Sequence, residues 1–463
     1  MNEVLPLTTR EVAEMAGGRL DGEPAASLAG VAIDSRAVHP GDLFVALPGD
    51  RTDGHAFVGD AIARGASALM VRSDATIPDG PAAVRVPDTL AGLQSLAAGV
   101  RARLEATVVA ITGSSGKTIT KELTAAVARS RFSTVASAAS FNNEIGVPLT
   151  LLNADEGTEV IVAEVGSRGI GHIASLMPLI RPDVGVVLNV GPAHIGMFGS
   201  LENVAIAKGE LVEGLDGDGV AILNADDAAV AAMTSRTSAR AITFGSSAGA
   251  DVRAEGVRLT PDGAASFTLI AADGSAPVML RMPGEHLVSD ALAAAAVGHA
   301  LGIGVVDAAA ALSSAEGPAW RMQVVDATDG WRVINDSYNA NPASTAAALK
   351  TLVIVGKGRR TWAVLGYMAE LGDTAAAEHD RIGRLAVRLG VSRLIVVGED
   401  ARPLYEAARL EGMTPEEASL VPSADDALAM LRSSLEPDDV VLVKASRVVG
   451  LERVAMAIAG ADA

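Results

Sequence analysis

The stretch Thr107-Val-Val-Ala-Ile-Thr112-Gly-Ser-Ser-Gly116-Lys117-Thr118 predicts a strand, a glycine-rich loop and the start of a helix. The glycines allow successive backbone N–H groups to converge on phosphate oxygens, and the helix N-terminus favours negative charge. Lys117 is placed to reach the β- and γ-phosphates and Thr118 to hold Mg²⁺. Ile111 stands where the full nucleotide-loop pattern has glycine, so a plain glycine turn before a helix is the alternative. The phosphate-binding candidates are Gly113, Ser114, Ser115, Gly116, Lys117 and Thr118.

Composition limits the classes of function. A chain of 463 residues is long enough for about three domains, each with its own core. Its net charge of −19 argues against binding nucleic acid or an anionic membrane by bulk electrostatics. The absence of cysteine excludes disulfides, thiolate zinc sites and thiol nucleophiles. The N-terminus has no signal-peptide pattern, and alanine-rich runs such as 291–297 are too short to span a bilayer, so we expect a cytoplasmic protein without membrane insertion.

Apolar runs around the loop predict an open α/β sheet. Residues 158–164, 183–189 and 219–223 are nearly continuous apolar segments, as expected for parallel strands with helices on both faces. From 251 to 282 the pattern changes to short alternating strands with turn signals at Pro261-Asp-Gly263 and Asp273-Gly274, which predicts antiparallel hairpins. We expect a central, P-loop-type, mostly parallel sheet.

Further α/β units flank this sheet. Short periodic segments between residues 8 and 71 predict a small N-terminal α/β domain, and strands at 361–365, 393–397 and 440–443 predict a Rossmann-like C-terminal sheet. The glycine-proline pair at 317–318 is typical of a boundary. The expected fold class is therefore α/β with three domains, at 1–104, 105–317 and 318–463.

Polar residues follow the central strands, at the sheet edge where open α/β folds bind ligands. Glu164 ends one strand, and its carboxylate can face a cation held by Thr118. His194 lies in the turn after the next strand, and Lys208 lies in a predicted helix, 201–211, with apolar neighbours. A desolvated lysine loses its proton more easily and could take up CO₂ as a carbamate that ligates metal. The alternatives are a solvated strand end, a hydrogen-bonded turn histidine and a lysine that reaches solvent.

Two other groups of polar residues are candidates for substrate binding. Val31-Ala-Ile-Asp34-Ser35-Arg36 predicts a strand with a polar tip that could bind a phosphate or a uracil-type edge, although such pairs are more often solvated. In the third segment, the run 335–342 has more hydrogen-bonding side chains than a turn needs. An asparagine-rich turn remains an alternative. Lys444 and Arg447 follow a predicted strand, where they could bind a carboxylate together or could simply mark a charged helix start. The third-segment candidates are Arg321, Asp336, Tyr338, Asn339, Asn341, Lys444 and Arg447.

Taken together, these motifs resemble the Mur ligase family over nearly the whole chain, and most of all its MurF type. The resemblance is carried by Asp34-Ser-Arg36, Thr112-Gly-Ser-Ser-Gly-Lys-Thr118, Asn142-Asn-Glu-Ile-Gly-Val-Pro148, Glu164, Ala193-His194, Ala207-Lys-Gly-Glu210, Asn335-Asp-Ser-Tyr-Asn-Ala-Asn-Pro342, Met368-Ala-Glu-Leu-Gly372 and Lys444 to Arg447. It implies an ATP-dependent ligase that joins D-alanyl-D-alanine to UDP-N-acetylmuramoyl-tripeptide in peptidoglycan precursor synthesis. Nothing in the chain requires more than a monomer.

The resemblance also implies residue roles. Ser35 and Arg36 would hold the uridine diphosphate end, and Asn143 would position the UDP-linked substrate. Thr118 and Glu164 would bind one Mg²⁺. His194 and carbamylated Lys208 would serve a second. Arg321 would reach the γ-phosphate and Asp336 the ribose of ATP, and the substrate side would be completed by Tyr338, Asn339, Asn341, Lys444 and Arg447.

The chain departs from the family pattern at a few positions. His286-Leu287 and Asp290 stand where two asparagines usually frame the base, Tyr367 stands where aspartate often precedes Met368, and Ala445 replaces a glycine. Three other classes of function compete. A sibling ligase that adds one amino acid, or glutamate to folate, should lack the 335–342 run. A non-catalytic nucleotide-binding module has no use for Lys208 together with His194, and a purely structural protein need not keep either.

Overall fold

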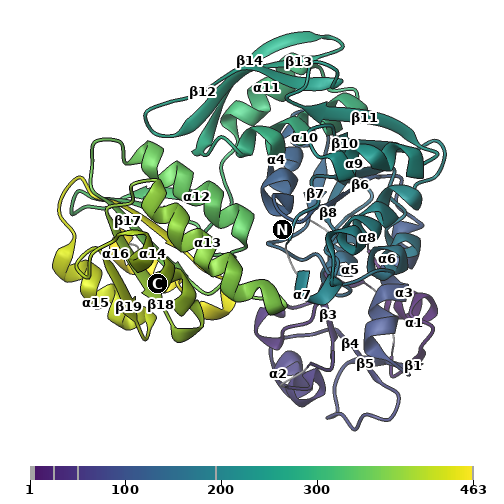
Figure 1. Ribbon diagram of the computed structural model, residues 1–463. Helices are drawn as coiled ribbons and strands as arrows, with labels where there is room; N and C mark the ends of the chain where they lie inside the picture. The colour runs from purple at the N-terminus through teal and green to yellow at the C-terminus, as the bar shows by residue number, and fades with distance from the viewer. Residues whose placement is uncertain (1–5, 24–26, 50–51, 193–194, 461–463) are drawn as a thin grey trace.

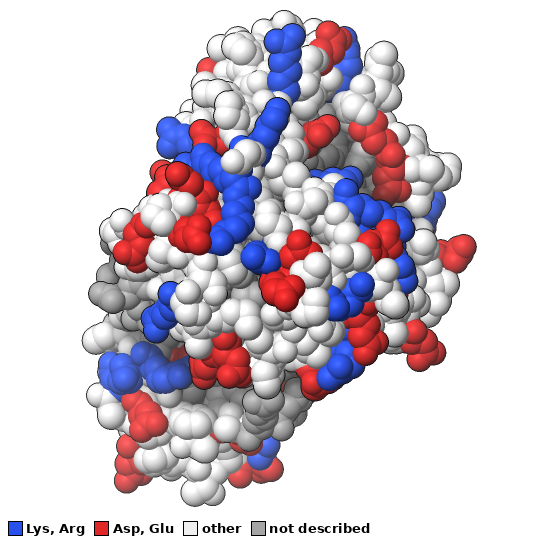
Figure 2. All heavy atoms as spheres, turned by 60° about the vertical axis from the view of Figure 1, so that its left-hand side comes forward, with Lys and Arg blue, Asp and Glu red and all other residues white. Residues whose placement is uncertain are grey.

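The computed structural model describes residues 6–23, 27–49, 52–192 and 195–460. They form three β-sheets covered by helices, and Figure 1 shows the C-terminal unit at the left, beside the central and N-terminal units. The predicted α/β fold class is confirmed. Basic and acidic side chains lie interspersed over the face drawn in Figure 2. Within the described ranges, no helix has both the length and the apolarity needed to cross a membrane.

The N-terminal sheet has five strands in the order β1-β5-β4-β3-β2, with β1 antiparallel to its neighbour. The predicted strand with a polar tip is wrong in its second half, because β2 ends at Ala32. Asp34 instead caps a 3₁₀ helix, Ser35–Ala37, since its carboxylate accepts the N–H of Arg36. The elements are α1 Thr9–Met15, β1 Arg19–Asp21, β2 Gly30–Ala32, β3 Asp42–Val45, α2 Val58–Ala63, β4 Ala68–Arg72 and β5 Ala82–Val86.

The central sheet has nine strands in the order β14-β13-β12-β11-β10-β9-β6-β8-β7. The strands from β6 to β12 pair in parallel, and β13 and β14 add the predicted antiparallel hairpins. The strands are β6 Thr107–Thr112, β7 Thr134–Ala136, β8 Val160–Glu164, β9 Val184–Val187, β10 Val220–Asn224, β11 Arg240–Gly245, β12 Val252–Leu259, β13 Ala264–Ala271 and β14 Gly274–Pro283.

Helices cover both faces of the central sheet, because successive side chains of β6 point to opposite sides. Val108 and Ala110 join a core with α3, α5, α6 and α8, whereas Val109 and Ile111 join a core with α4, α10 and α11. The first core also contains Leu43 of the N-terminal sheet, so these two units are packed together. The helices are α3 Thr89–Arg101, α4 Lys117–Arg129, α5 Gly146–Leu152, α6 His172–Ile180, α7 Ile195–Phe198, α8 Leu201–Glu213, α9 Ala228–Ala231, α10 Leu287–Ala300 and α11 Val305–Ser314.

The C-terminal sheet has six strands in the order β15-β16-β20-β17-β18-β19, all parallel except the edge strand β15. Its two core clusters contain only residues from 322 onward, so this unit has hydrophobic cores of its own. The elements are β15 Gln323–Asp326, β16 Arg332–Asn335, α12 Pro342–Val355, β17 Thr361–Gly366, α13 Ala375–Arg388, β18 Arg393–Val397, α14 Arg402–Glu411, β19 Ala418–Val421, α15 Ala424–Ser434, β20 Val440–Lys444 and α16 Glu452–Ala459.

Two separated contacts join the C-terminal unit to the central unit, in addition to that of Arg321 described below. At one, the N–H of Gly196 on α7 faces the carbonyl of Glu370 at 3.4 Å. At the other, Asp262 in the β12–β13 turn forms an ion pair with Arg332 at 2.5 Å. Because their hydrophobic cores are separate, these two units are free to change their relative orientation more easily than the central and N-terminal units, which share a core.

Candidate active site

The phosphate loop lies between β6 and α4, as the sequence predicted. Gly116 adopts φ +83°, a left-handed conformation that residues with a side chain rarely adopt. It is the N-cap of α4. The Lys117 ammonium donates to the carbonyl of Gly113 at 2.8 Å and so folds back over the loop. Asn189, at the end of β9, accepts the N–H of Ser115 at 2.9 Å. The conformation of the loop is therefore stabilised by hydrogen bonds that involve Asn189 and Lys117.

Glu164 and Thr118 meet beside this loop. The Thr118 hydroxyl donates to Glu164 Oε2 at 2.9 Å, and Asn142 Nδ2 donates to Glu164 Oε1 at 2.8 Å. Both Thr118 and Glu164 are buried, so the carboxylate is fixed in place. A hydroxyl and a carboxylate are hard oxygen donors of the kind that Mg²⁺ prefers, together with substrate phosphates. The donor set therefore fits a magnesium ion bound with the nucleotide.

Among the described residues, no three His, Cys, Asp or Glu side chains converge as a metal cluster. His194, the predicted ligand for a second ion, lies outside the described residues. Its relation to Thr118 and Glu164 therefore stays a prediction.

Lys208 is buried on α8 with 4% of its surface exposed, which contradicts the alternative in which it reaches solvent. Burial lowers its pKa well below the ordinary lysine value, and the nearby positive charge of Lys117 lowers it further. The pKa of Lys117 is also lowered, mainly because water is excluded from its ammonium. Lys208 therefore carries an uncharged amine more readily than an ordinary lysine, and this is the form that reacts with CO₂.

Arg321 reaches across from the connection between the central and C-terminal units. Its guanidinium donates to the Ser140 hydroxyl at 2.9 Å, and Ser140 also lies 3.1 Å from the Thr118 hydroxyl. The flanking residues Trp320 and Met322 have φ values of 61° and 49°. Non-glycine residues in this region are strained, and such strain persists where the surroundings hold it, often at functional sites. The connection thus aims Arg321 at the phosphate side of the site.

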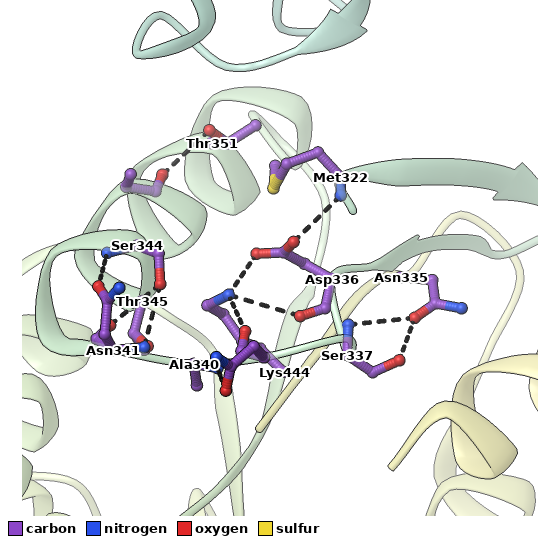
Figure 3. Close-up of polar contacts among 12 residues, drawn as sticks. Met322, Asn335, Asp336, Ser337, Ala340, Asn341, Ser344, Thr345, Thr351 and Lys444 are labelled. Atoms are coloured by element: carbon purple, nitrogen blue, oxygen red, sulfur yellow. Dashed lines mark hydrogen bonds and ion pairs between the residues drawn. The ribbon is translucent and has the colours of Figure 1, made fainter. Parts of the chain in front are cut away.

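Several motif residues of the C-terminal unit bind one another (Figure 3). The Lys444 ammonium, buried at the end of β20, forms an ion pair with Asp336 Oδ2 at 2.6 Å and donates to the carbonyl of Asn339 at 2.8 Å. Asp336 Oδ1 also accepts the N–H of Met322 at 3.2 Å. Lys444 is therefore a buried partner of Asp336, and its donors are already engaged within the chain.

Other members of the 335–342 run have local partners. Asn341 caps α12, because its side chain accepts the N–H of Ser344 at 2.9 Å. Asn339 accepts the N–H of Ala340, and the ring of Tyr338 lies under the Arg321 guanidinium at 4.1 Å. The alternative of an asparagine-rich turn therefore accounts for Asn341, whereas Tyr338 faces the interdomain side.

Arg447 is partly exposed beyond the end of β20. Its guanidinium stacks on the ring of Trp320 at 4.6 Å and forms an ion pair with Glu452 at 2.9 Å. The loop that carries Tyr367 and Met368 is held from behind by buried His379, whose Nε2 accepts the N–H of Met368 at 2.9 Å. Arg447 and this loop thus flank the Asp336–Lys444 pair.

One departure from the family pattern, Asp290, lies directly against the phosphate loop. Asp290 on α10 is buried and accepts the Thr120 hydroxyl at 3.1 Å, and a Cβ added at Gly116 would lie 2.3 Å from its Oδ1. Burial raises the pKa of Asp290 to about 7. Burial also lowers the pKa of His286 to about 4, so the imidazole is neutral at pH 7. A protonated Asp290 keeps a donor and an acceptor beside the loop, much as an amide would.

Two of the predicted uridine-side residues, Ser35 and Arg36, lie in the N-terminal unit, and no hydrogen bond or ion pair among the described residues joins them to the phosphate loop. Arg36 is exposed and paired with Asp34 at 2.7 Å, whereas Ser35 is buried. Asn143 uses its side-chain oxygen to accept the N–H groups of Ile145 and Gly146 at the start of α5. Thr118, Glu164 and Arg321 are thus brought together through Ser140, whereas Ser35 and Arg36 lie in another unit.

Sequence reasoning missed Asn142 and Ser140, which link the metal-side carboxylate to Arg321. Asn142 lies in the motif Asn142-Asn-Glu-Ile-Gly-Val-Pro148, for which the family resemblance implies a substrate role only for Asn143. Ser140 is an ordinary serine two residues before that motif, and only the fold brings it within reach of Thr118 and Arg321.

Comparisons with known proteins agree with this geometry. The Mur ligase family, catalytic domain, matches residues 27–101, the Mur ligase middle domain matches 111–298, and the Mur ligase, glutamate ligase domain, matches 320–447. A UDP-N-acetylmuramoyl-tripeptide--D-alanyl-D-alanine ligase of Mycobacterium tuberculosis is 43% identical, with 99% of each chain covered. The enzyme of that name from Escherichia coli is 36% identical, with 98% of this chain and 99% of that one covered.

Solved structures show the same architecture. A crystal structure of MurF from Acinetobacter baumannii has a TM-score of 0.87 and 30% identity, and covers 99% of both chains. MurF ligase from Thermotoga maritima in complex with ADP has a TM-score of 0.79 and 28% identity, with 93% of this chain and 97% of that one covered. With three family domains in order and relatives that match almost its full length, the chain belongs to the Mur ligase family.

Proposed function

We propose that this protein is an ATP-dependent ligase that joins D-alanyl-D-alanine to UDP-N-acetylmuramoyl-tripeptide, with ADP and phosphate as the other products. Relatives of that name cover nearly the whole chain at 43% and 36% identity. The single observation that supports the chemistry best is the convergence of the phosphate loop, Glu164 and Arg321 around Thr118 and Ser140. The product class places the enzyme in peptidoglycan precursor synthesis.

Forming an amide from a carboxylate and an amine requires activation, which ATP supplies. The terminal carboxylate of the tripeptide attacks the γ-phosphorus, the bond to the β-phosphate oxygen breaks, and ADP leaves from an acyl phosphate. The dipeptide amine then attacks the acyl carbon, phosphate leaves, and the amine loses a proton. Lys117 and Arg321 stabilise the charge on the transferred group, so no protein nucleophile is needed.

Thr118 and Glu164 would hold one Mg²⁺, and His194 with carbamylated Lys208 would hold a second. Magnesium, when bound, neutralises phosphate charge and orients the in-line attack. The carbamate forms when the uncharged Lys208 amine attacks CO₂ and loses a proton, which turns a neutral amine into an anionic ligand. The lowered pKa of Lys208 supports this step.

The remaining assignments follow the family pattern. Ser35, Arg36 and Asn143 would bind the UDP-linked substrate, Asp336 the ribose, and Tyr338, Asn339, Arg447 and Lys444 would shape the acceptor side, with Lys444 acting through Asp336. Domain limits at 104 and 317 are supported because each sheet lies within one segment. We further propose a monomer that works in the cytoplasm, where nucleotide-linked precursors are available.

A sibling ligase is the second candidate. Folylpolyglutamate synthase of Mycobacterium tuberculosis resembles the chain at 16% identity, and a relative at that level shares the fold alone. The Asp-Ser-Tyr-Asn-Ala-Asn-Pro run at 336–342 and the full-length relatives favour the dipeptide ligase.

The test is product formation by the purified full chain. With ATP, Mg²⁺, UDP-N-acetylmuramoyl-tripeptide and D-alanyl-D-alanine, mass spectrometry should show the UDP-linked pentapeptide, and phosphate release should require both peptide substrates. Product with a single amino acid or a folate in place of the dipeptide would support the sibling ligase. Phosphate release that is indifferent to both substrates would overturn the proposal.

A further inference from the structure

Lys121 on α4 is a buried cation that has no role in the mechanism above. Its side chain is fully buried, and its ammonium donates to the carbonyl of Ser137 at 2.6 Å and to that of Ala139 at 2.9 Å. It also forms an ion pair with Glu122 at 2.7 Å. Because both carbonyls lie in the segment between β7 and α5, Lys121 fastens that segment to the helix that follows the phosphate loop.

The fastened segment is constrained in two further ways. Ala139 has φ 45°, a left-handed conformation in which residues other than glycine are strained and which persists where the surroundings hold it. The Ser137 hydroxyl accepts the N–H of Glu164 at 3.1 Å. Ser140, the next residue after Ala139, is therefore presented by a segment that is tied both to α4 and to the end of β8.

The Ser140 hydroxyl belongs to a directed chain of hydrogen bonds. The single proton of the Thr118 hydroxyl is donated to Glu164, so Thr118 accepts the proton of Ser140 at 3.1 Å. The Ser140 oxygen in turn accepts from the Arg321 guanidinium at 2.9 Å. The chain thus runs from a guanidinium through two hydroxyls to a carboxylate, and bonds in such a chain strengthen one another.

Arg321 is held close to the phosphate loop with donors to spare. Its guanidinium stacks on the ring of Tyr338 at 4.1 Å and, within the described part of the chain, makes one hydrogen bond, to Ser140, although a guanidinium has several N–H donors. Its charge reaches the loop, because it adds to the burial that lowers the pKa of Lys117. Two cations kept close together attract an anion, and the γ-phosphate is the anion that the proposed reaction brings to this loop.

We propose, on the basis of the proposed function, that Ser140 is a positioning residue that makes the site select a nucleotide with a γ-phosphate over ADP. Its hydroxyl holds Arg321 beside the phosphate loop before the nucleotide binds. The guanidinium therefore meets the γ-phosphate with little further loss of side-chain freedom. ADP has no γ-phosphate and gains nothing from this arrangement, so Ser140 favours the substrate nucleotide over the product nucleotide.

The experiment measures how tightly the full chain binds ADP and the non-hydrolysable ATP analogue AMPPCP, each with Mg²⁺, by isothermal titration calorimetry. Ser140→Ala should weaken binding of AMPPCP about 2- to 10-fold, the effect expected when one long side chain has to be ordered on binding, and leave ADP binding unchanged. Ser140→Thr, which keeps a hydroxyl, should restore the wild-type ratio of the two affinities.

A second background separates a role through Arg321 from a general structural role. In Arg321→Gln the guanidinium is absent, so adding Ser140→Ala should change the ratio of the two affinities no further. If Ser140→Ala weakens AMPPCP equally in both backgrounds, or weakens ADP as much as AMPPCP, Ser140 acts through Thr118 or the loop. The positioning assignment is then wrong, while the ligase function stands.

Ser433→Ala is the matched control, because its hydroxyl is exposed and donates to the carbonyl of Met430 at 2.9 Å within α15. It should keep the wild-type ratio of the two affinities. Thermal denaturation of each variant checks that folding is intact. If wild type binds neither nucleotide and yields no UDP-linked pentapeptide in the product assay, the proposed function itself fails.

Discussion

The phosphate loop and the strand ends of the C-terminal sheet use similar residues in different ways. Both present polar side chains where a parallel strand ends. In the central unit the Lys117 ammonium donates to a carbonyl of its own loop, that of Gly113, and we propose that it also binds the nucleotide. In the C-terminal unit such side chains bind each other, because Lys444 is buried in an ion pair with Asp336. Polarity at a strand end therefore indicates either a site or the scaffold beside it, and the partners decide which.

The largest expected effect is on stability and tests the Lys444–Asp336 ion pair of the C-terminal unit. Lys444→Met should leave the Asp336 carboxylate largely buried without its partner, which costs about 3–5 kcal/mol. The free energy of unfolding, measured with urea, should fall by that amount. Adding Asp336→Asn removes the unpaired charge and should restore a large part of the stability. If Lys444→Met leaves stability unchanged and abolishes only dipeptide binding, Lys444 belongs to the ligand side after all.

The next largest expected effect is on activity and tests Lys117 of the phosphate loop. Lys117→Met should lower kcat/KM for ATP by about 100- to 1,000-fold, because a preorganised charge on the transferred phosphate is lost. Urea unfolding should stay close to wild type, since the ammonium contacts only one loop carbonyl. The exposed Lys350→Met on α12 serves as control. A strong loss of stability together with normal turnover would reverse the roles assigned to the two regions.

The smallest expected effect is on stability and concerns Asp290. This residue lies against the phosphate loop and is buried, as Lys444 is. Because burial raises its pKa to about 7, the folded state holds a proton that the unfolded state releases above about pH 4. Stability should therefore fall as pH rises from about 4 to 7 and level off above 7. Asp290→Asn removes this dependence and should gain about 2 kcal/mol over wild type between pH 5 and 7.

Urea unfolding at pH 5, 6, 7 and 8 measures this gain. Asp79→Asn, at an exposed position in the N-terminal unit, should show no comparable gain. If Asp290→Asn and wild type keep a constant difference in the free energy of unfolding at all four pH values, Asp290 is ionised throughout. The carboxylate would then act on the loop as a permanent charge.

Local patterns were sufficient wherever the determining contacts are close in sequence. The predicted strand before the phosphate loop coincides with β6, because a β-branched run followed by glycine has few other structures available. The hairpins of β12, β13 and β14 were recognised from their turns. The strands β1, β5, β7, β11 and β19 were not predicted, since a short strand inside a mixed segment depends on its neighbours in the sheet.

Some predictions failed for equally physical reasons. The segment 31–36 was expected to be a strand throughout, but the Asp34 side chain competes for the N–H of Arg36 and turns the chain. The Lys444–Asp336 pair joins residues 108 positions apart, and no local pattern announces it. The burial of Lys208 depends on how α8 packs against the central sheet, which the helix sequence alone left open.

By itself, the sequence determined the α/β class, the phosphate loop and the family, because these depend on short-range backbone preferences and on motifs with fixed spacing. Only the tertiary structure decided which polar residues form hydrogen bonds or ion pairs within the protein and which remain candidates for binding a ligand. The reason is that hydrogen-bond and ion-pair partners come from distant segments. Burial, which sets the charge state of Lys208 and Asp290, is likewise a property of the packed chain.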